Sequence, residues 1–208
     1  MMTCVFIHGL GQTPSSWDKV TAHLPTDIQI YRPSLSAILK GEQITYEKLY
    51  KAFENECSHI EGPLYLCGIS LGAVLALHYA ISNPEKAASL MLIAPQHKMP
   101  GLLLDIQNIV FRLLPQAAFG SMGFSKRDVI ALTASMKKLD FTPMLNGLTC
   151  PSFVICGQKD RANRNAAGIL ANAIPDAKLS FVESAGHEVN MDAPEALADL
   201  IKKAWFYE

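Results

Sequence analysis

An α/β fold with about six mostly parallel strands is predicted for this chain of 208 residues. Two observations lead to that prediction. Short apolar runs typical of strands recur along the chain, with segments of helical spacing between them. Most of the runs are continuously apolar, as expected for strands covered on both faces. The runs are Thr3 to His8, Asp27 to Arg32, Pro63 to Gly68, Ala88 to Ala94, Pro151 to Cys156 and Lys178 to Glu183.

Helical patterns fill the spaces between these runs. From Tyr46 to Ile60, apolar residues recur at steps of three and four and form a single apolar stripe. The pair Asn83-Pro84 ends the helix after the third run, and Pro194 suits the first turn of the last helix. The other predicted helices are Ser15 to Leu24, Leu71 to Ser82, Asn163 to Ile174 and Pro194 to Phe206.

The connection from Pro95 to Met144 is too long for an ordinary loop and is rich in Leu, Ile, Met and Phe. A structureless loop of that length is suspect inside a compact domain. We therefore expect one domain over residues 1–208, with a small helical cap inserted at about residues 96–144. A pair of ordinary packing helices is the alternative.

Composition and charge narrow the class of partner. Hydrophobic residues make up 50% of the chain and charged residues 18%, and the formal net charge is −1. This composition is typical of a folded protein. It lacks the positively charged surface that would attract nucleic acid. No secretory signal or membrane span is recognisable, and the five cysteines include no CxxC pair. We expect a cytoplasmic protein with reduced thiols, no metal or cofactor, and a small molecule as its partner.

The stretch from Leu66 to Ala80 places Ser70 between Gly68 and Gly72, where a strand pattern changes into a helix pattern. This is the setting in which G-x-S-x-G carries a mechanism. In such a sharp turn, side chains two residues away would collide with neighbouring backbone, and glycine removes the collision. Ser70 Oγ would project beside the N–H groups of the helix. We predict Ser70 as a nucleophile; a turn in which it only caps the helix is the alternative.

A serine hydroxyl needs an adjacent base to become a strong nucleophile. Among the six histidines, His187 follows the last strand run, on the edge of the sheet where Ser70 is expected. It is the predicted base, and a loop histidine bonded to backbone is the alternative. The other histidines suit packed, capping or loop-orienting roles: His8, His23, His59 and His78.

A carboxylate is then needed to fix the tautomer of the base and to stabilise imidazolium. Asp160 stands directly after the fifth run, on the same edge, and is the predicted acid. Its alternative role is an exposed loop residue that caps the next helix. The competing carboxylates are Asp140, Asp176 and Asp192.

The segment HGLG, His8 to Gly11, follows the first strand run, and its glycines let the backbone approach a ligand closely. The amides of Leu10 and Leu71 are the predicted oxyanion donors, and each such donor contributes roughly 3 kcal/mol to transition-state stabilisation. Gly9 and His97, at the start of the inserted segment, are further candidates for substrate binding.

Taken together in chain order, these motifs resemble the α/β-hydrolase superfamily. The likeness rests on CVFIHGLGQTPSSWDKVTAHL, LYLCGISLGAVLALHYA, CPSFVICGQKD and GHEVNMDAPEALADLI, and covers nearly the whole chain. The resemblance implies a Ser-His-Asp hydrolase of the esterase, lipase or lactonase kind, with a cap after the sixth family strand and no cofactor. It also implies the α/β-hydrolase fold for the predicted sheet.

One feature departs from this family. Its members usually carry a β-hairpin before the HG strand, whereas this chain starts on that strand. The run from Asp27 to Arg32 would then lie at or near an edge of the sheet, which needs cover or a partner. A homodimer through this edge is a hypothesis, and a monomeric sedimentation coefficient at high micromolar concentration would contradict it.

The sequence thus predicts acyl transfer, and the apolar inserted segment favours a small, largely uncharged carboxylic ester, thioester or lactone. Two rivals remain. The scaffold also resembles lyases and synthases, including the menaquinone-pathway enzyme that eliminates pyruvate, and ligand receptors that keep the triad with little turnover. An anionic lyase substrate would need positively charged side chains near the mouth of the site. The candidates are Lys98, Lys126, Arg127, Arg161 and Arg164.

Overall fold

The computed structural model describes residues 2–39, 44–116, 119 and 123–207. In this part of the chain, six strands form one parallel sheet in the order β2-β1-β3-β4-β5-β6. The predicted α/β class and strand number are therefore confirmed. The strands are β1 (Thr3–Ile7), β2 (Gln29–Tyr31), β3 (Leu64–Ile69), β4 (Ala87–Ile93), β5 (Ser152–Gly157) and β6 (Lys178–Val182).

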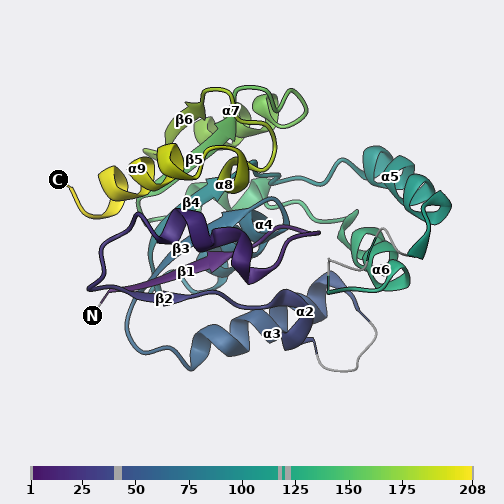
Figure 1. The fold of residues 1–208 in the computed structure, drawn as a ribbon, viewed down its shortest axis with the longest axis horizontal. Helices are drawn as coiled ribbons and strands as arrows, with labels where there is room; N and C mark the ends of the chain where they lie inside the picture. The colour runs from purple at the N-terminus through teal and green to yellow at the C-terminus, as the bar shows by residue number, and fades with distance from the viewer. Residues whose placement is uncertain (1, 40–43, 117–118, 120–122, 208) are drawn as a thin grey trace.

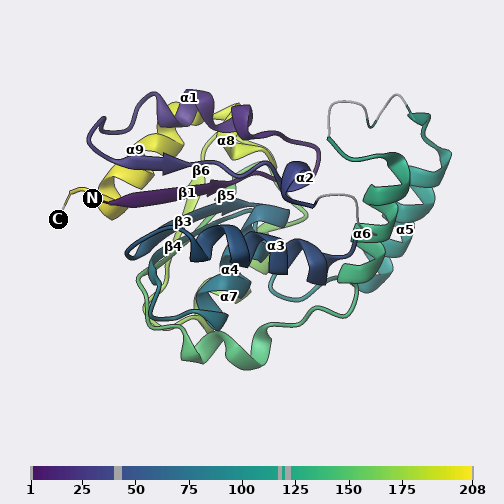
Figure 2. The same ribbon diagram turned by 90° about the horizontal axis from the view of Figure 1, so that it is seen from below.

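Helices cover both faces of the sheet (Figures 1 and 2). Figure 2 shows α3, α4 and α7 on one face and α1, α8 and α9 on the other. The short α2 and the 3-10 helices η1 and η3 lie in the connections. The bounds are η1 (Pro14–Trp17), α1 (Asp18–Thr21), α2 (Leu35–Ile38), α3 (Tyr46–Ser58), α4 (Leu71–Ser82), α5 (Gly101–Leu113), α6 (Lys126–Met136), η3 (Thr142–Gly147), α7 (Arg164–Ala173), α8 (Val189–Asp192) and α9 (Pro194–Trp205).

The two-sided cover explains why the strands read as continuous apolar runs. In β1, Val5 and Ile7 pack into the core beneath α3 and α4, whereas Cys4 and Phe6 pack into the core beneath α1 and α9. All four side chains are fully buried. Side chains on a strand alternate between its faces, so a strand buried on both sides needs an apolar residue at every position.

Parallel pairing brings the carboxyl ends of all the strands to one edge of the sheet. The loops after β1, β3, β5 and β6 therefore meet there, and this is the edge at which open α/β sheets bind ligands. Across the sheet, β2 is an outermost strand and pairs only with β1, as expected for the run from Asp27 to Arg32. Dimerisation through β2 stays a prediction.

The prediction of one continuous helix from Ser15 to Leu24 is wrong. The structure has a 3-10 turn, η1, followed by a single turn of α-helix, α1. Thr21 Oγ1 bonds the carbonyls of Trp17 and Asp18, at 3.0 Å and 3.2 Å. Such side-chain bonds compete with the helical ladder, and Pro25 follows directly after Leu24. The short segment still buries Trp17 and Val20 against the sheet.

The inserted segment, residues 96–144, contains α5 and α6, which lie side by side beyond the end of the sheet (Figure 1). Its two ends run together as a short neck. Met99 N donates to Leu139 O at 3.0 Å, and Phe141 N donates to His97 O at 2.8 Å. The segment therefore leaves and re-enters the domain at one place, between β4 and β5.

Two further sequence expectations concern membranes and thiols. No helix in the described ranges is long and apolar enough to cross a membrane. All five cysteines are free, and four of them are buried. Burial raises the pKa of the Cys156 thiol to about 11, so this thiol stays protonated at neutral pH.

Candidate active site

Ser70 occupies a strained turn between β3 and α4. Its backbone has φ +54° and ψ −115°, in a region that residues with a side chain rarely adopt. The Ser70 amide donates to Ile93 O of the neighbouring strand at 2.9 Å, which anchors the turn to the sheet. A non-glycine residue persists in such a conformation only when its surroundings enforce it, and such strain is typical of functional sites.

The glycines on either side of Ser70 provide that enforcement through close backbone contacts. A Cβ atom on Gly68 would lie 2.2 Å from the carbonyl oxygen of Gly72. A Cβ atom on Gly72 would lie 2.1 Å from the carbonyl oxygen of Ile7, in β1. Both separations are well inside van der Waals contact, so the turn can approach β1 only if these positions lack side chains.

Gly72→Ala is therefore expected to lower the free energy of unfolding by about 3 kcal/mol or more, because backbone atoms of β1 cannot give way. Gly168 is a matched control, since it also lies in a helix but a Cβ there meets nothing within 4 Å. Gly168→Ala should raise stability by about 0.5–1 kcal/mol. Urea unfolding of both variants is the measurement, and equal midpoints would contradict the steric argument.

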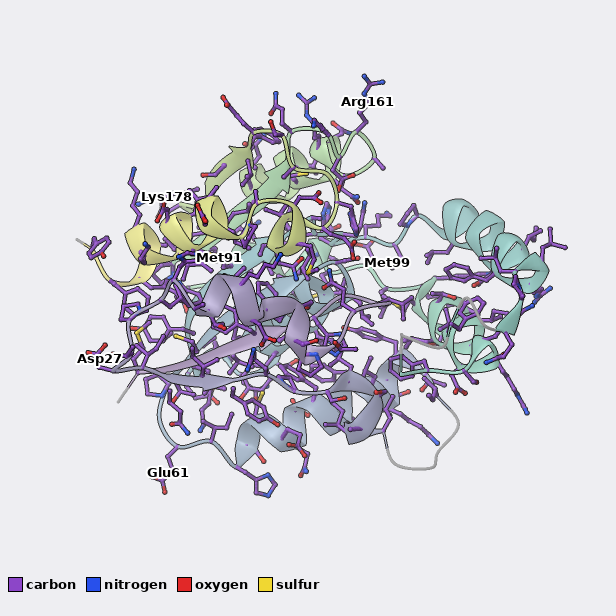
Figure 3. The ribbon with its side chains drawn as sticks, viewed as in Figure 1. Asp27, Glu61, Met91, Met99, Arg161 and Lys178 are labelled. Carbon is purple, nitrogen blue, oxygen red and sulfur yellow. The ribbon has the colours of Figure 1, made fainter. Side chains whose placement is uncertain are left out.

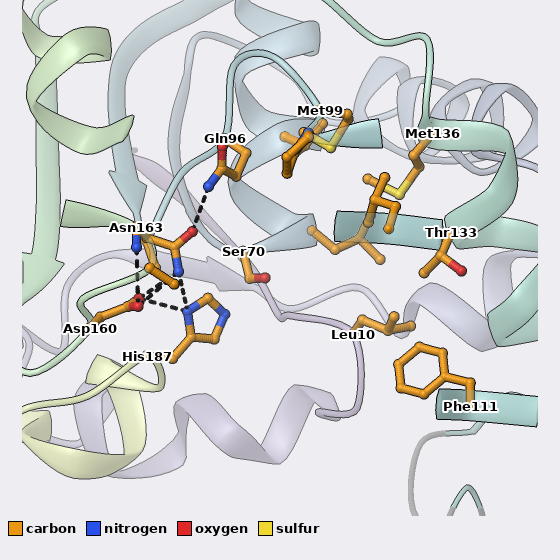
Figure 4. Close-up of a pocket in the computed structure, with 16 residues that line it drawn as sticks. Leu10, Ser70, Gln96, Met99, Phe111, Thr133, Met136, Asp160, Asn163 and His187 are labelled. Carbon is orange, nitrogen blue, oxygen red and sulfur yellow. Dashed lines mark hydrogen bonds and ion pairs between the residues drawn. The ribbon is translucent and has the colours of Figure 1, made fainter. Parts of the chain in front are cut away.

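The loops after β5 and β6 bring Asp160 and His187 together (Figure 4). Asp160 Oδ2 lies 2.8 Å from His187 Nδ1. The Asp160 side chain is 5% exposed and the His187 side chain 44% exposed, so a buried carboxylate supports a ring that reaches solvent. Among the described residues no hydrogen bond joins His187 to Ser70 Oγ, although both side chains line one cavity. Catalytic hydrogen bonds often tighten only when substrate is bound.

Asn163 adds a partner to this pair that sequence reasoning missed. Its Nδ2 donates to Asp160 Oδ1 at 2.9 Å and to Oδ2 at 2.8 Å, and lies 3.1 Å from His187 Nδ1. Its Oδ1 accepts from Gln96 Nε2 at 2.7 Å. Asn163 stands three residues after Asp160, the offset of a local Asx-type hydrogen bond, and that spacing was the available signal. The carboxylate is thus held by its neighbours as well as by His187.

The predicted oxyanion donors lie at the same edge. Leu10, in the loop after β1, and Leu71, at the start of α4, both line the cavity with Ser70. Neither main-chain amide has a hydrogen-bond partner in the part of the chain that is described. Free amides at this position are suited to a developing negative charge.

His8 holds the loop that carries Leu10. Its Nδ1 lies 2.9 Å from Gly9 O and its Nε2 accepts from Leu35 N at 3.2 Å, so Nδ1 carries the proton. Burial lowers the pKa of His8 below its ordinary value, although the hydrogen bond to Gly9 opposes this shift. A neutral ring suits this pattern of one donor and one acceptor.

The cavity above Ser70 has a volume of about 490 Å³. Its far wall is apolar and comes largely from the inserted segment, through Met99, Phe111 and Met136 (Figure 4). Thr133 also lines this wall, but its hydroxyl bonds Asn108 and the carbonyl of Val129 inside the segment. Neither Lys nor Arg is among the described residues that line the cavity.

The structure does not bring every predicted binding residue into the cavity. His97 is 8% exposed and lies in the neck, where its Nδ1 is buried and has no hydrogen-bond partner among the described residues. Gly9 packs against the Ser70 turn, since a Cβ on Gly9 would lie 3.5 Å from Ser70 Cβ. Neither residue lines the cavity.

The competing histidines and carboxylates have other partners. The ring of His78 stacks on Tyr50 with centroids 3.6 Å apart, and His59 Nδ1 lies 2.7 Å from the carbonyl of Asn55. Asp140 pairs with Lys98 at 2.9 Å. None of these residues lines the cavity.

The cations proposed for an anionic substrate also lie elsewhere. Lys98 is taken up by its pair with Asp140, and Arg164 lies over the ring of Phe181, 5.5 Å from its centroid. Arg161 points outward from the loop before α7 (Figure 3). Among the residues that the structure describes, no cationic side chain therefore lines the cavity where it could bind a carboxylate group of a substrate.

Comparison with known proteins yields two curated relatives of note. A pimeloyl-[acyl-carrier protein] methyl ester esterase from Aromatoleum aromaticum is 24% identical over 241 residues, which cover 95% of this chain and 96% of that protein. A putative 2-succinyl-6-hydroxy-2,4-cyclohexadiene-1-carboxylate synthase from Haemophilus influenzae is 26% identical over 111 residues, which cover 50% of this chain and 44% of that protein.

Solved structures with the same fold include a thermophilic esterase and MenH. A thermophilic esterase from Thermogutta terrifontis superimposes with a TM-score of 0.78 at 20% identity, over 98% of this chain and 89% of that one. MenH from S. aureus gives a TM-score of 0.81 at 15% identity, over 96% and 91%. A sequence profile described as "Alpha/beta hydrolase family" matches residues 4–200. The chain therefore belongs to the alpha/beta hydrolase family.

Proposed function

We propose that this protein is a serine hydrolase that cleaves a small, largely apolar carboxylic ester, thioester or lactone through an acyl-enzyme intermediate. The observation that carries the proposal is the meeting of three loops at one cavity. There the strained Ser70 faces the same space as the His187 ring, whose Nδ1 is held 2.8 Å from Asp160. This set of groups matches a nucleophile, a base and an orienting acid.

Each group has one step in the proposed reaction. Because Asp160 engages Nδ1 of His187, Nε2 is the atom available to take the proton of Ser70 Oγ. The oxygen attacks the carbonyl carbon, and the negative charge that develops on the carbonyl oxygen is accepted by the amides of Leu10 and Leu71. His187 then protonates the leaving group. Water, activated by the same ring, attacks the acyl-enzyme and releases the acid and free Ser70.

The cavity wall supports a substrate class. Met99, Phe111 and Met136 surround the space beyond Ser70, so we propose that residues 96–144 act as a cap that binds an apolar acyl or alcohol group. Such a cap also keeps water from the site, which strengthens the polar interactions within it. The relatives named as methyl ester esterases support hydrolysis of an ester in which the reacting end carries no charge.

The synthase likeness supports a second candidate, a lyase or synthase in which the triad acts as a base. It rests on the relative from H. influenzae and on the fold of MenH. The absence of Lys and Arg from the described lining argues against it, because an anionic substrate would be poorly compensated there. A receptor-like protein with little turnover is the third candidate, and nothing in the cavity favours it over catalysis.

A charge comparison tests the substrate class. We expect p-nitrophenyl butyrate to be hydrolysed with a kcat/KM at least about 30-fold above that of p-nitrophenyl hemisuccinate, because an unpaired carboxylate in this cavity costs about 2 kcal/mol or more. The two esters share their leaving group and have nearly the same length, so the comparison isolates the effect of the negative charge. Equal or reversed kcat/KM values would favour the lyase, which product analysis with an enolisable acid would then identify.

A further inference from the structure

Gln12 lies in the loop that carries Leu10 and is buried, at 8% exposure. Its amide both accepts and donates hydrogen bonds. Oε1 accepts from the main-chain amide of Gly9 at 3.2 Å, within the same loop. Nε2 donates to Glu188 Oε1 at 2.9 Å and to Asn190 Oδ1 at 3.2 Å. Gln12 therefore connects the loop after β1 to the segment that directly follows His187.

Asn190 completes the connection from the other side. It is fully buried, and its Nδ2 donates to the carbonyl of Ser16 at 3.2 Å and to Gln12 Oε1 at 3.3 Å. Ser16 Oγ also contacts Gln12 Oε1, at 3.4 Å. Buried amides that satisfy one another in this way fix their relative positions, because each lost bond leaves an unpaired polar group.

Hydrogen bonds also link the residues on either side of His187, so a contact that fixes one part of this segment also fixes the rest. Asp192 Oδ2 accepts from Gly186 N at 2.7 Å, and Asp192 N donates to Glu188 O at 2.8 Å. The His187 backbone lies between these bonded positions. A displacement of Glu188 or Asn190 relative to Gln12 would therefore move His187 relative to the Leu10 amide.

We propose that Gln12 is a positioning residue, which fixes the Leu10 amide and the His187 ring at the separation that attack by Ser70 requires. The inference rests on the function proposed above. An amide suits the task because it accepts from Gly9 at one end and donates to Glu188 at the other. A carboxylate lacks the donor and a thioether lacks both groups. Reacting groups must be held within about 0.5 Å of their productive geometry, so loss of this connection slows the chemistry.

The test is the rate at which a fluorophosphonate labels Ser70, because labelling requires the nucleophile and the oxyanion donors but no particular substrate. Gln12→Met keeps the side-chain volume and removes both hydrogen-bonding ends. We expect labelling to slow by about 10- to 100-fold, which is no more than the loss of rate caused by removing one oxyanion donor. With an ester that wild type hydrolyses, kcat should fall in the same proportion while KM stays within about threefold.

Two further variants separate positioning from general stability. Gln12→Glu places a carboxylate against Glu188 and should also slow labelling, and adding Glu188→Gln should restore the rate, because amide and carboxylate have then exchanged places across one hydrogen bond. Ser89→Ala is the control for loss of a buried hydrogen bond. Ser89 accepts from Trp205 Nε1 at 3.0 Å at the start of β4, the opposite end of the sheet from Ser70, so labelling should be unchanged.

Each outcome decides the proposal. Wild-type labelling rates for folded Gln12→Met would overturn it and leave the proposed function standing. If Gln12→Met does not fold, the paired variants decide, and failure of Glu188→Gln to restore Gln12→Glu rejects the inference. Absence of label in wild-type protein would reject the proposed function, and this inference with it.

Discussion

Ser70→Ala is expected to abolish ester hydrolysis, with kcat reduced by roughly 10⁴-fold or more, because the nucleophile is lost while the oxyanion donors remain. The folded state should tolerate the change. Ser70 Oγ has no hydrogen-bond partner among the described residues, and alanine is no more strained than serine at φ +54°. The measurement is the initial rate of p-nitrophenyl butyrate hydrolysis, with the unfolding midpoint measured alongside.

A second substitution makes the same position more informative. Ser70→Gly should be equally inactive but more stable than wild type by about 1 kcal/mol, because glycine adopts a positive φ without strain. Turnover by Ser70→Ala at the wild-type rate would remove Ser70 from the mechanism. Fluorophosphonate labelling followed by peptide mapping identifies the modified residue directly.

Asp160→Asn is expected to reduce kcat/KM by roughly 10³- to 10⁴-fold. The carboxylate now accepts from His187 Nδ1 and from Asn163 Nδ2, so both of its oxygens are engaged by donors. An amide would turn its own N–H₂ group toward one of these neighbours. Donation to Nδ1 would favour the His187 tautomer with a proton on Nε2, which cannot take the proton of Ser70.

Asp140→Asn is the matched control. Asp140 was one of the competing carboxylates, and in the structure it pairs with Lys98 in the neck, where both side chains are exposed to solvent. An exposed pair contributes little to stability, so kcat/KM should stay near the wild-type value. A large loss in Asp140→Asn with little loss in Asp160→Asn would reverse the assignment of the acid.

Elements with strong local signals were predictable from the sequence. Leu71–Ser82 is a helix over the residues predicted, because its start is set by the Ser70 turn and its end by Asn83-Pro84. The strands agree within two residues at each end, since continuous apolar runs have few alternatives in an α/β pattern. The α/β-hydrolase likeness rested on the same motifs, and the family match confirms it.

Features that depend on distant contacts were not predictable. Nothing local to Gln12 or Asn190 indicates that they meet, because 178 residues of sequence separate them. Asn163 looked like the start of a helix, and only the fold shows that its side chain also reaches His187. His97 was a reasonable binding candidate by position, but the pairing of residues 97–99 with 139–141 places it in the neck. The direction of such side chains is decided by packing.

The neck has a consequence for how this protein can diversify. Met99, Phe111 and Met136 all come from one continuous stretch of chain, whereas Ser70, Asp160 and His187 lie outside it. Since that stretch departs and returns through adjacent hydrogen-bonded backbone, a different stretch with the same closely spaced ends could replace it and leave the strands undisturbed. Under the proposed function, we therefore expect a graft between residues 97 and 141 to alter substrate selectivity while preserving the reactivity of Ser70.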